Sequence, residues 1–347
     1  MRIGVVPEGV VERLVLASGL APAPILETLG ALWLARAIMA GTKLGVFEAL
    51  ADGPLTVADV ATRCGTHRGA TGKLLSALVG ARYLRVAGER YELTPVARRW
   101  LLKGSPSSLY DQMLFRYLEW DLIARYEDFI RSGQPVRVHQ EFDAEQWELY
   151  QRGMRSLAGL SAPEVARRLR VPSGARSMLD IGGSHGLYSV AICRRHPTLR
   201  AVILDLPEAV AHAAPILARE GMGDRVVHRA GNALTDDLGD REHDVIFTAN
   251  LVHHFDDATN RTFVRRIARA LRPSGVLVIL EVVRPRSPRE AGQLGTLADL
   301  YFAVTSESGT WSFGEMAGWQ AEAGLVPQKP ISLRSIPGGG LQIAVKR

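Results

Sequence analysis

Two acidic side chains, each at the end of an apolar run and separated by a glycine-rich turn, give the middle of the chain the chemistry of a ligand-binding site. The first run, residues 177–181, contains Asp180, and the second, residues 201–204, is followed by Asp205. Three glycines follow the first run: Gly182, Gly183 and Gly186. With the helical pattern of residues 187–196 between them, the two runs predict a strand–helix–strand unit. The glycines would let the strand turn sharply into the helix and let a ligand approach the backbone.

The ligand that fits this unit has an amino-acid tail and a ribose but no phosphate. A dinucleotide fingerprint would need glycines where the chain has Ser184 and Leu187, and this departure argues against a nicotinamide or flavin cofactor. Asp180 would repel a pyrophosphate but attract an ammonium group, directly or through water. Asp205, at the tip of the next strand, can accept hydrogen bonds from two ribose hydroxyls. These features indicate S-adenosylmethionine (SAM).

A histidine pair at the end of a later strand is the candidate for proton transfer. Residues 243–250 read as a buried strand, and His253 and His254 follow within the segment Leu-Val-His-His-Phe-Asp-Asp. Open α/β sheets place their chemistry at the carboxyl ends of strands, and imidazole titrates near neutrality, so a general base is expected here. Two other roles stay open. One ring could cap the helix that begins near Asp256, or the pair could hold a metal together with that acid or Asp257.

Three motifs resemble those of the class I SAM-dependent small-molecule O-methyltransferases of the plant caffeic-acid and bacterial polyketide type. They are the strand with Asp-x-Gly-Gly-x-x-Gly, the strand with Asp-Leu-Pro, and residues 251–257, which are similar to Leu-His-Asp-Trp-x-Asp. In this resemblance His253 falls on the catalytic histidine and His254 on the motif's Asp. Glu281 falls on the acid that orients the histidine, and a carboxylate at a strand end has no apolar reason to be there. Thr310 stands where the family has a second flanking acid.

The resemblance also implies which residues meet the cofactor and the acceptor. Near the adenine the family usually has an Asp, and here Asn232 replaces it with an amide that can still form hydrogen bonds. Residues 147–154 are similar to an aromatic-x-x-x-Gly/Ala-Met motif, which makes Met154 an acceptor contact beside His254, with core packing as its other reading. The expected cofactor contacts are Asp180, Gly182, Gly183, Gly186, Asp205, Leu206, Asn232, Ala233 and Asn250.

The N-terminal part of the chain reads as a winged helix. Apolar residues recur at helical spacing over residues 25–40. They are followed by a helix capped by Thr56, a second helix over residues 69–80 and a hairpin over residues 83–93. A net charge of +6 and a pI of about 9.5 permit a DNA-binding reading. The second helix, however, offers mainly Lys73 for reading bases. The resemblance implies instead that this module forms a homodimer.

Composition sets the remaining bounds. The 347 residues are 47% hydrophobic and 22% charged, which is an ordinary globular composition. Two cysteines far apart predict neither a disulfide scaffold nor a metal cluster, and no signal peptide opens the chain, so a cytoplasmic protein is expected. The most apolar stretch, residues 29–50, contains charged side chains, which favours a buried helix over a membrane span. Residues 1–22 read as an irregular tail.

These patterns together predict an α/β protein. A winged-helix dimerisation domain would occupy residues 1–104, connecting helices around the acceptor pocket residues 105–175, and a SAM-binding domain residues 176–347. Its Rossmann-like, mostly parallel sheet would end in an antiparallel hairpin. The expected reaction is methyl transfer from SAM to a hydroxyl of an aromatic or polyketide-like small molecule, without metal, nucleic-acid or membrane partners.

Two alternatives remain at this level. The same fold could methylate carbon or serve another SAM-dependent reaction, and the winged helix could belong to a DNA-binding regulator with a ligand domain. An amine or nucleobase acceptor is disfavoured, because the motif Asn/Asp-Pro-Pro-aromatic is absent from the fourth strand of the expected sheet.

Overall fold

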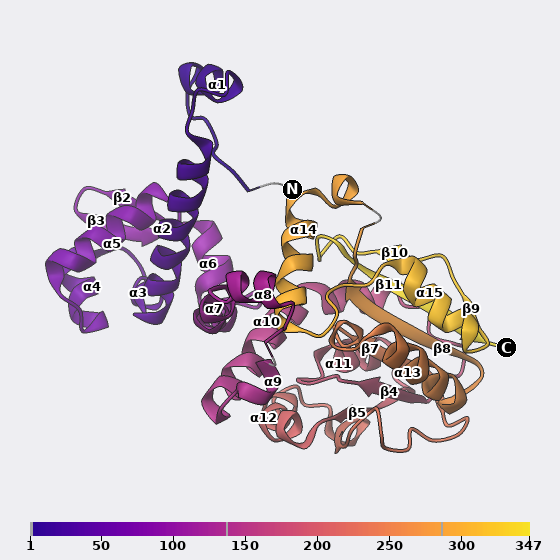
Figure 1. Ribbon diagram of the computed structural model, residues 1–347. Helices are drawn as coiled ribbons and strands as arrows, with labels where there is room; N and C mark the ends of the chain where they lie inside the picture. The colour runs from indigo at the N-terminus through magenta and orange to yellow at the C-terminus, as the bar shows by residue number, and fades with distance from the viewer. Residues whose placement is uncertain (1–2, 137, 286) are drawn as a thin grey trace. The chain divides into compact units, whose positions relative to one another are not determined.

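The computed structural model describes residues 3–136, 138–285 and 287–347, which form two compact units (Figure 1). The first unit ends at Leu118, and the second runs from Glu119 to Arg347. Each unit has a hydrophobic core of its own.

The N-terminal unit consists of helices around a small antiparallel sheet. Its elements are α1 (Val10–Ala17), α2 (Ala23–Lys43), α3 (Val46–Ala49), β1 (Leu55–Thr56), α4 (Val57–Cys64), α5 (Arg68–Gly80), β2 (Leu84–Ala87), β3 (Arg90–Leu93), α6 (Pro95–Leu101) and the start of α7 (Tyr110–Ile123). The strands pair in the order β1–β3–β2. At the start of α4, Thr56 Oγ1 accepts a hydrogen bond from the N–H of Asp59 at 3.3 Å, which completes a capping box. The expected succession of two short helices and a hairpin is present.

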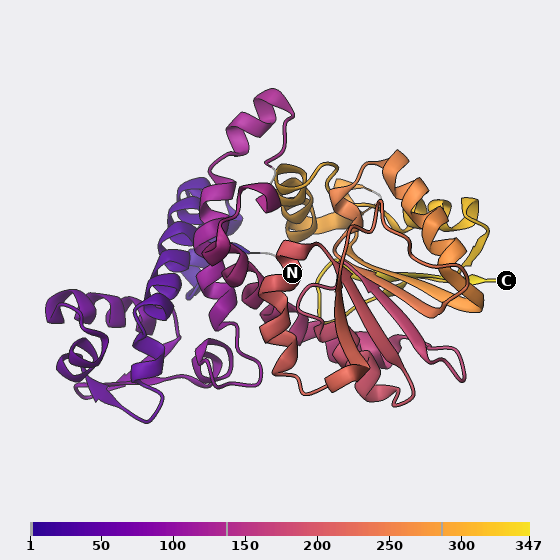
Figure 2. The same cartoon turned by 90° about the horizontal axis from the view of Figure 1, so that it is seen from below.

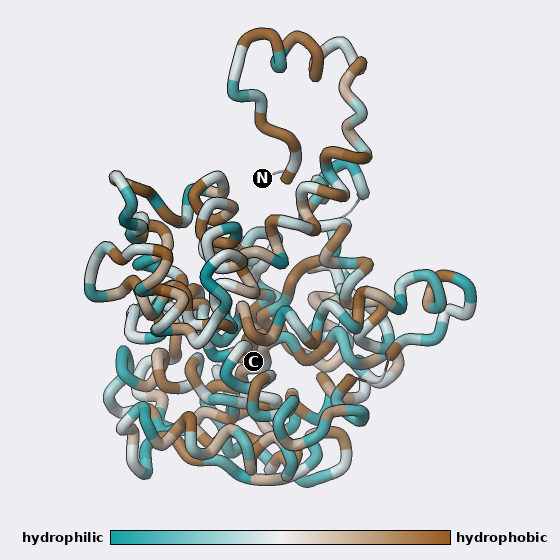
Figure 3. Tube along the Cα trace, turned by 90° about the vertical axis from the view of Figure 1, so that its left-hand side faces the viewer, coloured by the Kyte–Doolittle hydropathy of each residue, from teal (hydrophilic) through white to brown (hydrophobic). Residues whose placement is uncertain are grey.

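One expectation for the N-terminal segment is wrong, because residues 10–17, expected to be irregular, form α1. In the single chain, helix α2 exposes most of its apolar side chains, including Leu32 and Trp33, the latter 64% exposed. Figure 3 shows long hydrophobic stretches along this segment. By length and composition alone α2 could cross a membrane, a test that core helices of soluble proteins and N-terminal signals also pass. Helical periodicity reveals an apolar face but not what covers that face.

The C-terminal unit is built on an eight-stranded sheet. Its helices are α8 (Tyr126–Ser132), α9 (Val138–Glu141), α10 (Ala144–Arg168), α11 (Leu187–Arg195), α12 (Pro207–Ala218), α13 (Asp257–Ala270), α14 (Pro288–Thr305) and α15 (Phe313–Glu322). Its strands are β4 (Ser177–Ile181), β5 (Arg200–Asp205), β6 (Val226–Ala230), β7 (His243–Ala249), β8 (Leu271–Val282), β9 (Leu325–Pro327), β10 (Ile331–Ser332) and β11 (Gly339–Lys346). Short 3₁₀ turns cover Gly223–Arg225 and Val252–His254.

The strands lie in the order β10–β11–β8–β7–β4–β5–β6, with β9 paired to β11. Strands β4 to β8 are parallel, whereas β11 is antiparallel to β8, β9 and β10. This is the predicted mostly parallel sheet with an antiparallel end. Residues 328–330 separate β9 from β10, and Pro330, which has no N–H to donate, lies in this gap.

Helices cover both faces of the sheet, as Figures 1 and 2 show. Successive side chains in a strand point to opposite faces. Met178 and Ile203 therefore join one core with α10 and α11, whereas Leu179 and Leu204 join a second core with α13 and α15. The apolar strands of the sequence are thus buried on both sides.

The order of strands reverses between β4 and β7, which creates the crevice that the site uses. From β4 the chain moves outward through β5 and β6 and then returns to pair β7 with the other side of β4. In an open α/β sheet the ligand crevice forms at such a reversal, outside the carboxyl ends of the strands. The glycine-rich turn, Asp205 and the histidine pair all follow strands that end at this edge.

Candidate active site

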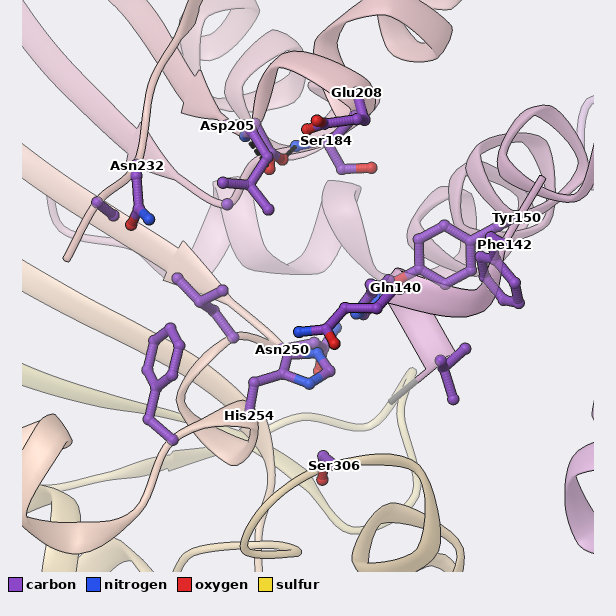
Figure 4. A pocket seen from close by; sticks show the side chains of 18 of the residues that line it. Gln140, Phe142, Tyr150, Ser184, Asp205, Glu208, Asn232, Asn250, His254 and Ser306 are labelled. Atoms are coloured by element: carbon purple, nitrogen blue, oxygen red, sulfur yellow. Dashed lines mark hydrogen bonds between the residues drawn. The ribbon is translucent and has the colours of Figure 1, made fainter. Parts of the chain in front are cut away.

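A cavity of about 800 Å³ lies at the carboxyl ends of β4, β5 and β7. Asp205, at the end of β5, and Asn250, in the loop after β7, form part of its wall, and α9 and α10 contribute much of the rest. Figure 4 shows Asp205 and Ser184 at the top of the view and His254 and Ser306 below. A cavity of this size has room for a nucleoside cofactor together with a small acceptor.

The glycine-rich turn is too tightly packed for a side chain at two positions. A Cβ atom on Gly183 would lie 2.5 Å from Cγ of Asp180. One on Gly186, whose φ is +75°, would lie 2.5 Å from Cδ1 of Ile203. Of the described residues in this turn, Gly182 and Ser184 line the cavity, whereas Gly183 and Gly186 support the turn from behind.

Asp180 lies beneath this turn rather than in the cavity wall. It is 1% exposed, and its Oδ2 accepts a hydrogen bond from Oγ of Ser189 at 2.6 Å. Its Oδ1 is buried and has no partner among the described residues. Burial raises the pKa of Asp180 to about 7, opposed by the Ser189 hydrogen bond and assisted by the charge of Asp205. A contact between this acid and a ligand's ammonium group stays a prediction.

Asp205 is the acid that reaches the cavity. Its carboxylate accepts hydrogen bonds from the N–H groups of Ser184 and Leu206, each at 2.8 Å. Burial raises the pKa of Asp205, although both hydrogen bonds act to lower it. Beside it, Oε1 of Gln151 accepts a hydrogen bond from the Ser184 hydroxyl, which leaves the buried Nε2 of Gln151 without a partner in the described part of the chain. A carboxylate and an unpaired amide donor thus stand together at one end of the cavity.

Four other residues that were predicted to contact the cofactor lie along the same wall of the cavity. Leu206, Asn232, Ala233 and Asn250 all line the cavity. Oδ1 of Asn232 accepts a hydrogen bond from the N–H of Leu234 at 2.9 Å, so its amide nitrogen is the atom left for a ligand. Asn250 adopts a left-handed backbone conformation, with φ of 51°, at the end of β7.

His253 and Glu281 form a buried pair. Nδ1 of His253 lies 2.9 Å from one carboxylate oxygen of Glu281, and the other oxygen accepts a hydrogen bond from the N–H of Val252 at 3.0 Å. Because an ionised carboxylate can only accept, the imidazole must donate from Nδ1 and carry its lone pair on Nε2. This is the tautomer that a general base requires.

His254, rather than His253, lines the cavity. The His253 ring packs against it at 4.2 Å between centroids and contacts the ring of Phe302 at 4.5 Å. Burial, reinforced by His253 and His139, lowers the pKa of His254 well below 6.5. None of the ion pairs in the described part of the chain joins His254 to an acid.

The structure places two further predicted residues away from direct contact with the cavity. Met154 is half-buried on α10, and it is Tyr150 and Gln151, about one turn earlier, that line the cavity wall. Thr310 is buried and donates hydrogen bonds from its hydroxyl and, at 3.2 Å, from its N–H to the carboxylate of Asp299 on α14. Thr310, which donates hydrogen bonds to an acid of α14, thus stands where the resemblance implies an acid.

The two acids that could have joined the histidine pair in a metal site, Asp256 and Asp257, accept hydrogen bonds from other groups. Asp256 caps α13 by accepting a hydrogen bond from the N–H of Thr259 at 2.7 Å, so no histidine ring acts as that cap. Asp257 accepts hydrogen bonds from Arg261 at 2.7 Å and Trp319 at 2.8 Å. Within the described ranges, no group of three or more His, Cys, Asp or Glu side chains is placed to hold a metal ion.

Comparison with known proteins agrees with this geometry. Residues 26–103 match the O-methyltransferase dimerisation domain, and residues 129–324 match the O-methyltransferase domain. The 3-hydroxy-5-methyl-1-naphthoate 3-O-methyltransferase of Streptomyces sahachiroi is 27% identical over 323 residues, which cover 91% of this chain and 92% of the relative. The N,N-dimethyltransferase OxyT of Streptomyces rimosus is 27% identical over 324 residues, 90% of this chain and 93% of the relative.

Solved structures of methyltransferases share this fold. The structure of human N-acetylserotonin methyltransferase in complex with SAM shares it with a TM-score of 0.82 and 19% sequence identity, covering 99% of both chains. With its dimerisation module, its mostly parallel sheet and its cavity at the strand ends, this chain belongs to the SAM-dependent O-methyltransferase family.

Proposed function

We propose that the protein transfers the methyl group of SAM to a hydroxyl oxygen of an aromatic or polyketide-like small molecule, with His253 as the general base. The observation that carries the proposal is the buried His253–Glu281 hydrogen bond of 2.9 Å. With Nδ1–H donated to Glu281, the imidazole has Nε2 available as a proton acceptor at the edge of the sheet where this fold places its chemistry. The relative from Streptomyces sahachiroi is named for methylation of an aromatic hydroxyl.

The residues at the Asp205 end of the cavity fit SAM. The carboxylate of Asp205, held by two backbone N–H groups, can accept hydrogen bonds from both ribose hydroxyls. The unpartnered Nε2 of Gln151 can donate to the carboxylate of the amino-acid tail. Asn232 and Ala233 can flank the adenine. When bound, SAM supplies a methyl group that its sulfonium has already activated.

The contribution of this chain to the reaction is to align the acceptor and remove its proton. Nε2 of His253 accepts the hydroxyl proton while the oxygen attacks the methyl carbon. The new bond joins oxygen and carbon, the carbon–sulfur bond breaks, and its electron pair stays on the sulfur of the product S-adenosylhomocysteine. Glu281 stabilises the imidazolium that forms, because its negative charge lies against Nδ1–H.

His254 is the competing candidate for the base, because it forms the cavity wall itself. Burial lowers the pKa of its imidazole well below 6.5, which makes it a weaker proton acceptor. It also lacks the carboxylate that would stabilise its protonated form, at least among the ion pairs of the described residues. Both observations favour His253.

An amine acceptor is a second candidate. The sequence pattern disfavours it, but the relative from Streptomyces rimosus is named an N,N-dimethyltransferase. A neutral amine already carries the attacking lone pair, so it depends less on a base than a hydroxyl does. C-methylation, by contrast, would need the same base to remove a proton from an acidic carbon.

Binding and turnover measurements test these assignments in sequence. Calorimetry with SAM and S-adenosylhomocysteine examines the cofactor, and failure of the unaltered protein to bind either would overturn the function itself. A panel of hydroxyarenes and arylamines then examines the acceptor. His253→Ala is expected to keep cofactor affinity and lower turnover of hydroxyarenes about 10²- to 10⁴-fold, while arylamine turnover changes less. Full hydroxyarene turnover by this variant would exclude His253 as the base.

We also propose that the protein is a cytoplasmic homodimer formed through the apolar face of α2. The match of residues 26–103 to a dimerisation domain supports this, as does the exposure of Leu29 and Trp33. The double substitution of both residues by Glu is expected to give a monomer in analytical ultracentrifugation. Val86→Glu, at an apolar position of β2 that is also exposed, serves as the control and should leave the dimer intact. A dimer that persists in the double variant would contradict this interface.

A further inference from the structure

Three imidazole rings lie in a row, and two of them, those of His139 and His254, line the cavity. The centroids of His253 and His254 are 4.2 Å apart, and those of His254 and His139 are 4.9 Å apart. The first two residues belong to the loop after β7, whereas His139 comes from α9, a short helix that carries none of the motifs in the sequence. His139 and His254 both line the cavity.

An aromatic frame holds the His139 ring in place. Its ring stacks on Trp147 at 5.4 Å with an interplanar angle of 24°, and it meets Tyr150 edge-on at 5.2 Å and Phe142 at 6.2 Å. These three aromatic residues also line the cavity, and Figure 4 shows Phe142 and Tyr150 side by side in its wall. Flat, rigid side chains of this kind favour a planar ligand, because aromatic rings pack in stacked or edge-on arrangements.

The polar atoms of His139 and His254 are available to a ligand. No hydrogen bond joins a ring nitrogen of either residue to another of the described residues, and none of these nitrogens is among the fully buried atoms that lack a partner. Burial, with a contribution from His253, lowers the pKa of His139 to about 4, and the pKa of His254 is also lowered. Both rings are therefore neutral near pH 7, and each offers one donor and one acceptor.

We propose that His139 is an acceptor-binding residue, and that with His254 it recognises a second oxygen next to the hydroxyl that is methylated. This inference rests on the proposed function. The acceptor class it names is a planar aromatic compound that carries two neighbouring oxygen groups on one edge, hydroxyl beside hydroxyl or hydroxyl beside carbonyl. With the reacting hydroxyl at His253, the next oxygen along that edge meets the nitrogens of His254 and His139. An acceptor with one oxygen would cover these nitrogens without satisfying them, which costs binding free energy.

Two matched probes separate this role from simple packing. They are 2,3-dihydroxynaphthalene and 2-naphthol, which share the ring and differ by one hydroxyl. Their binding to the protein saturated with S-adenosylhomocysteine is measured by calorimetry, and their methylation is measured with SAM. The unaltered protein is expected to bind the diol about 5- to 10-fold more tightly than the mono-ol, the worth of one net hydrogen bond.

His139→Phe preserves a flat ring against Trp147 and Tyr150 but removes both nitrogens. The expected result is loss of the preference for the diol, with the affinity for S-adenosylhomocysteine unchanged. His139→Asn, which restores a donor and an acceptor, should recover part of the preference. His212→Phe on α12, away from the cavity, is the control and should behave as the unaltered protein.

The outcomes distinguish this inference from the proposed function. If the unaltered protein shows no diol preference, or if His139→Phe keeps it, the inference is overturned while SAM-dependent methylation stands. If His139→Phe lowers binding of both probes equally, His139 has only a structural role and the inference also fails. If neither probe nor any other hydroxyarene is methylated although S-adenosylhomocysteine binds, the proposed function itself fails.

Discussion

The buried carboxylate of Glu281 serves two hydrogen-bond donors at once, and Glu281→Gln puts these two demands in conflict. One oxygen accepts the Val252 N–H at 3.0 Å and the other accepts Nδ1–H of His253 at 2.9 Å. A glutamine side chain has the same shape but only one oxygen, and its other terminal group is a donor. The backbone N–H cannot change its role, so the amide oxygen is expected to face Val252.

In that orientation the amide NH₂ faces His253 and forces Nδ1 to accept. The ring proton then moves to Nε2, and the lone pair needed to remove the acceptor's proton is lost. The flipped amide would set its NH₂ against the Val252 N–H and leave a buried donor unsatisfied, at a cost of about 1–3 kcal/mol. Because the site is buried, with Glu281 1% and His253 3% exposed, water offers no substitute partner. Adding the lost stabilisation of the imidazolium, we expect kcat to fall about 10²- to 10⁴-fold.

Single-turnover methylation with enzyme in excess over a hydroxyarene acceptor measures this effect, and calorimetry with SAM shows whether the cofactor end is intact. Glu164→Gln is the matched control. That buried carboxylate accepts hydrogen bonds from the N–H groups of Arg334 and Ser335, away from the cavity, and its loss should lower the melting temperature without slowing methyl transfer. A Glu281→Gln enzyme with wild-type kcat and normal SAM affinity would refute the reasoning about the tautomer of His253.

Three further predictions concern the cofactor end of the cavity. Asp205→Ala is expected to weaken SAM binding about 10- to 100-fold in calorimetry, because two charge-assisted hydrogen bonds are lost, and unchanged affinity would exclude the ribose assignment. Asp180→Asn should change the pH dependence of stability without ligand. Burial raises the folded-state pKa of Asp180 from 3.8 to about 7, so the unaltered protein loses stability as pH rises through this window. The variant should lose less between about pH 4 and pH 7 in thermal unfolding, and equal slopes would contradict the raised pKa. Gly183→Ala, whose Cβ would lie 2.5 Å from Cγ of Asp180, should lower the melting temperature and SAM affinity. Gly159→Ala on α10, where the nearest atom would be 4.0 Å away, should lower neither.

The sequence by itself determined the parts of the site whose signals are local. The glycines that form the turn after β4, the acid at the tip of β5 and the histidine at the end of β7 each depend on the few residues around them. A tight turn needs glycine, and a strand pattern that ends in a polar residue marks the edge of a sheet. These signals were sufficient to predict the α/β fold and SAM, and the resemblance added Glu281 as the partner of His253.

Only the tertiary structure decided which side chains share the cavity. His139 belongs to no motif, yet the packing of α9 brings its ring to 4.9 Å from that of His254. Gln151 meets Ser184, and Asp299 meets Thr310, through contacts between segments that no local pattern relates. Packing also places Asp180 beneath the turn, so its contact with a ligand stays a prediction. Patterns of spacing report on which face of an element a residue lies, whereas the neighbours of that face depend on strand order and helix packing, which long-range burial sets.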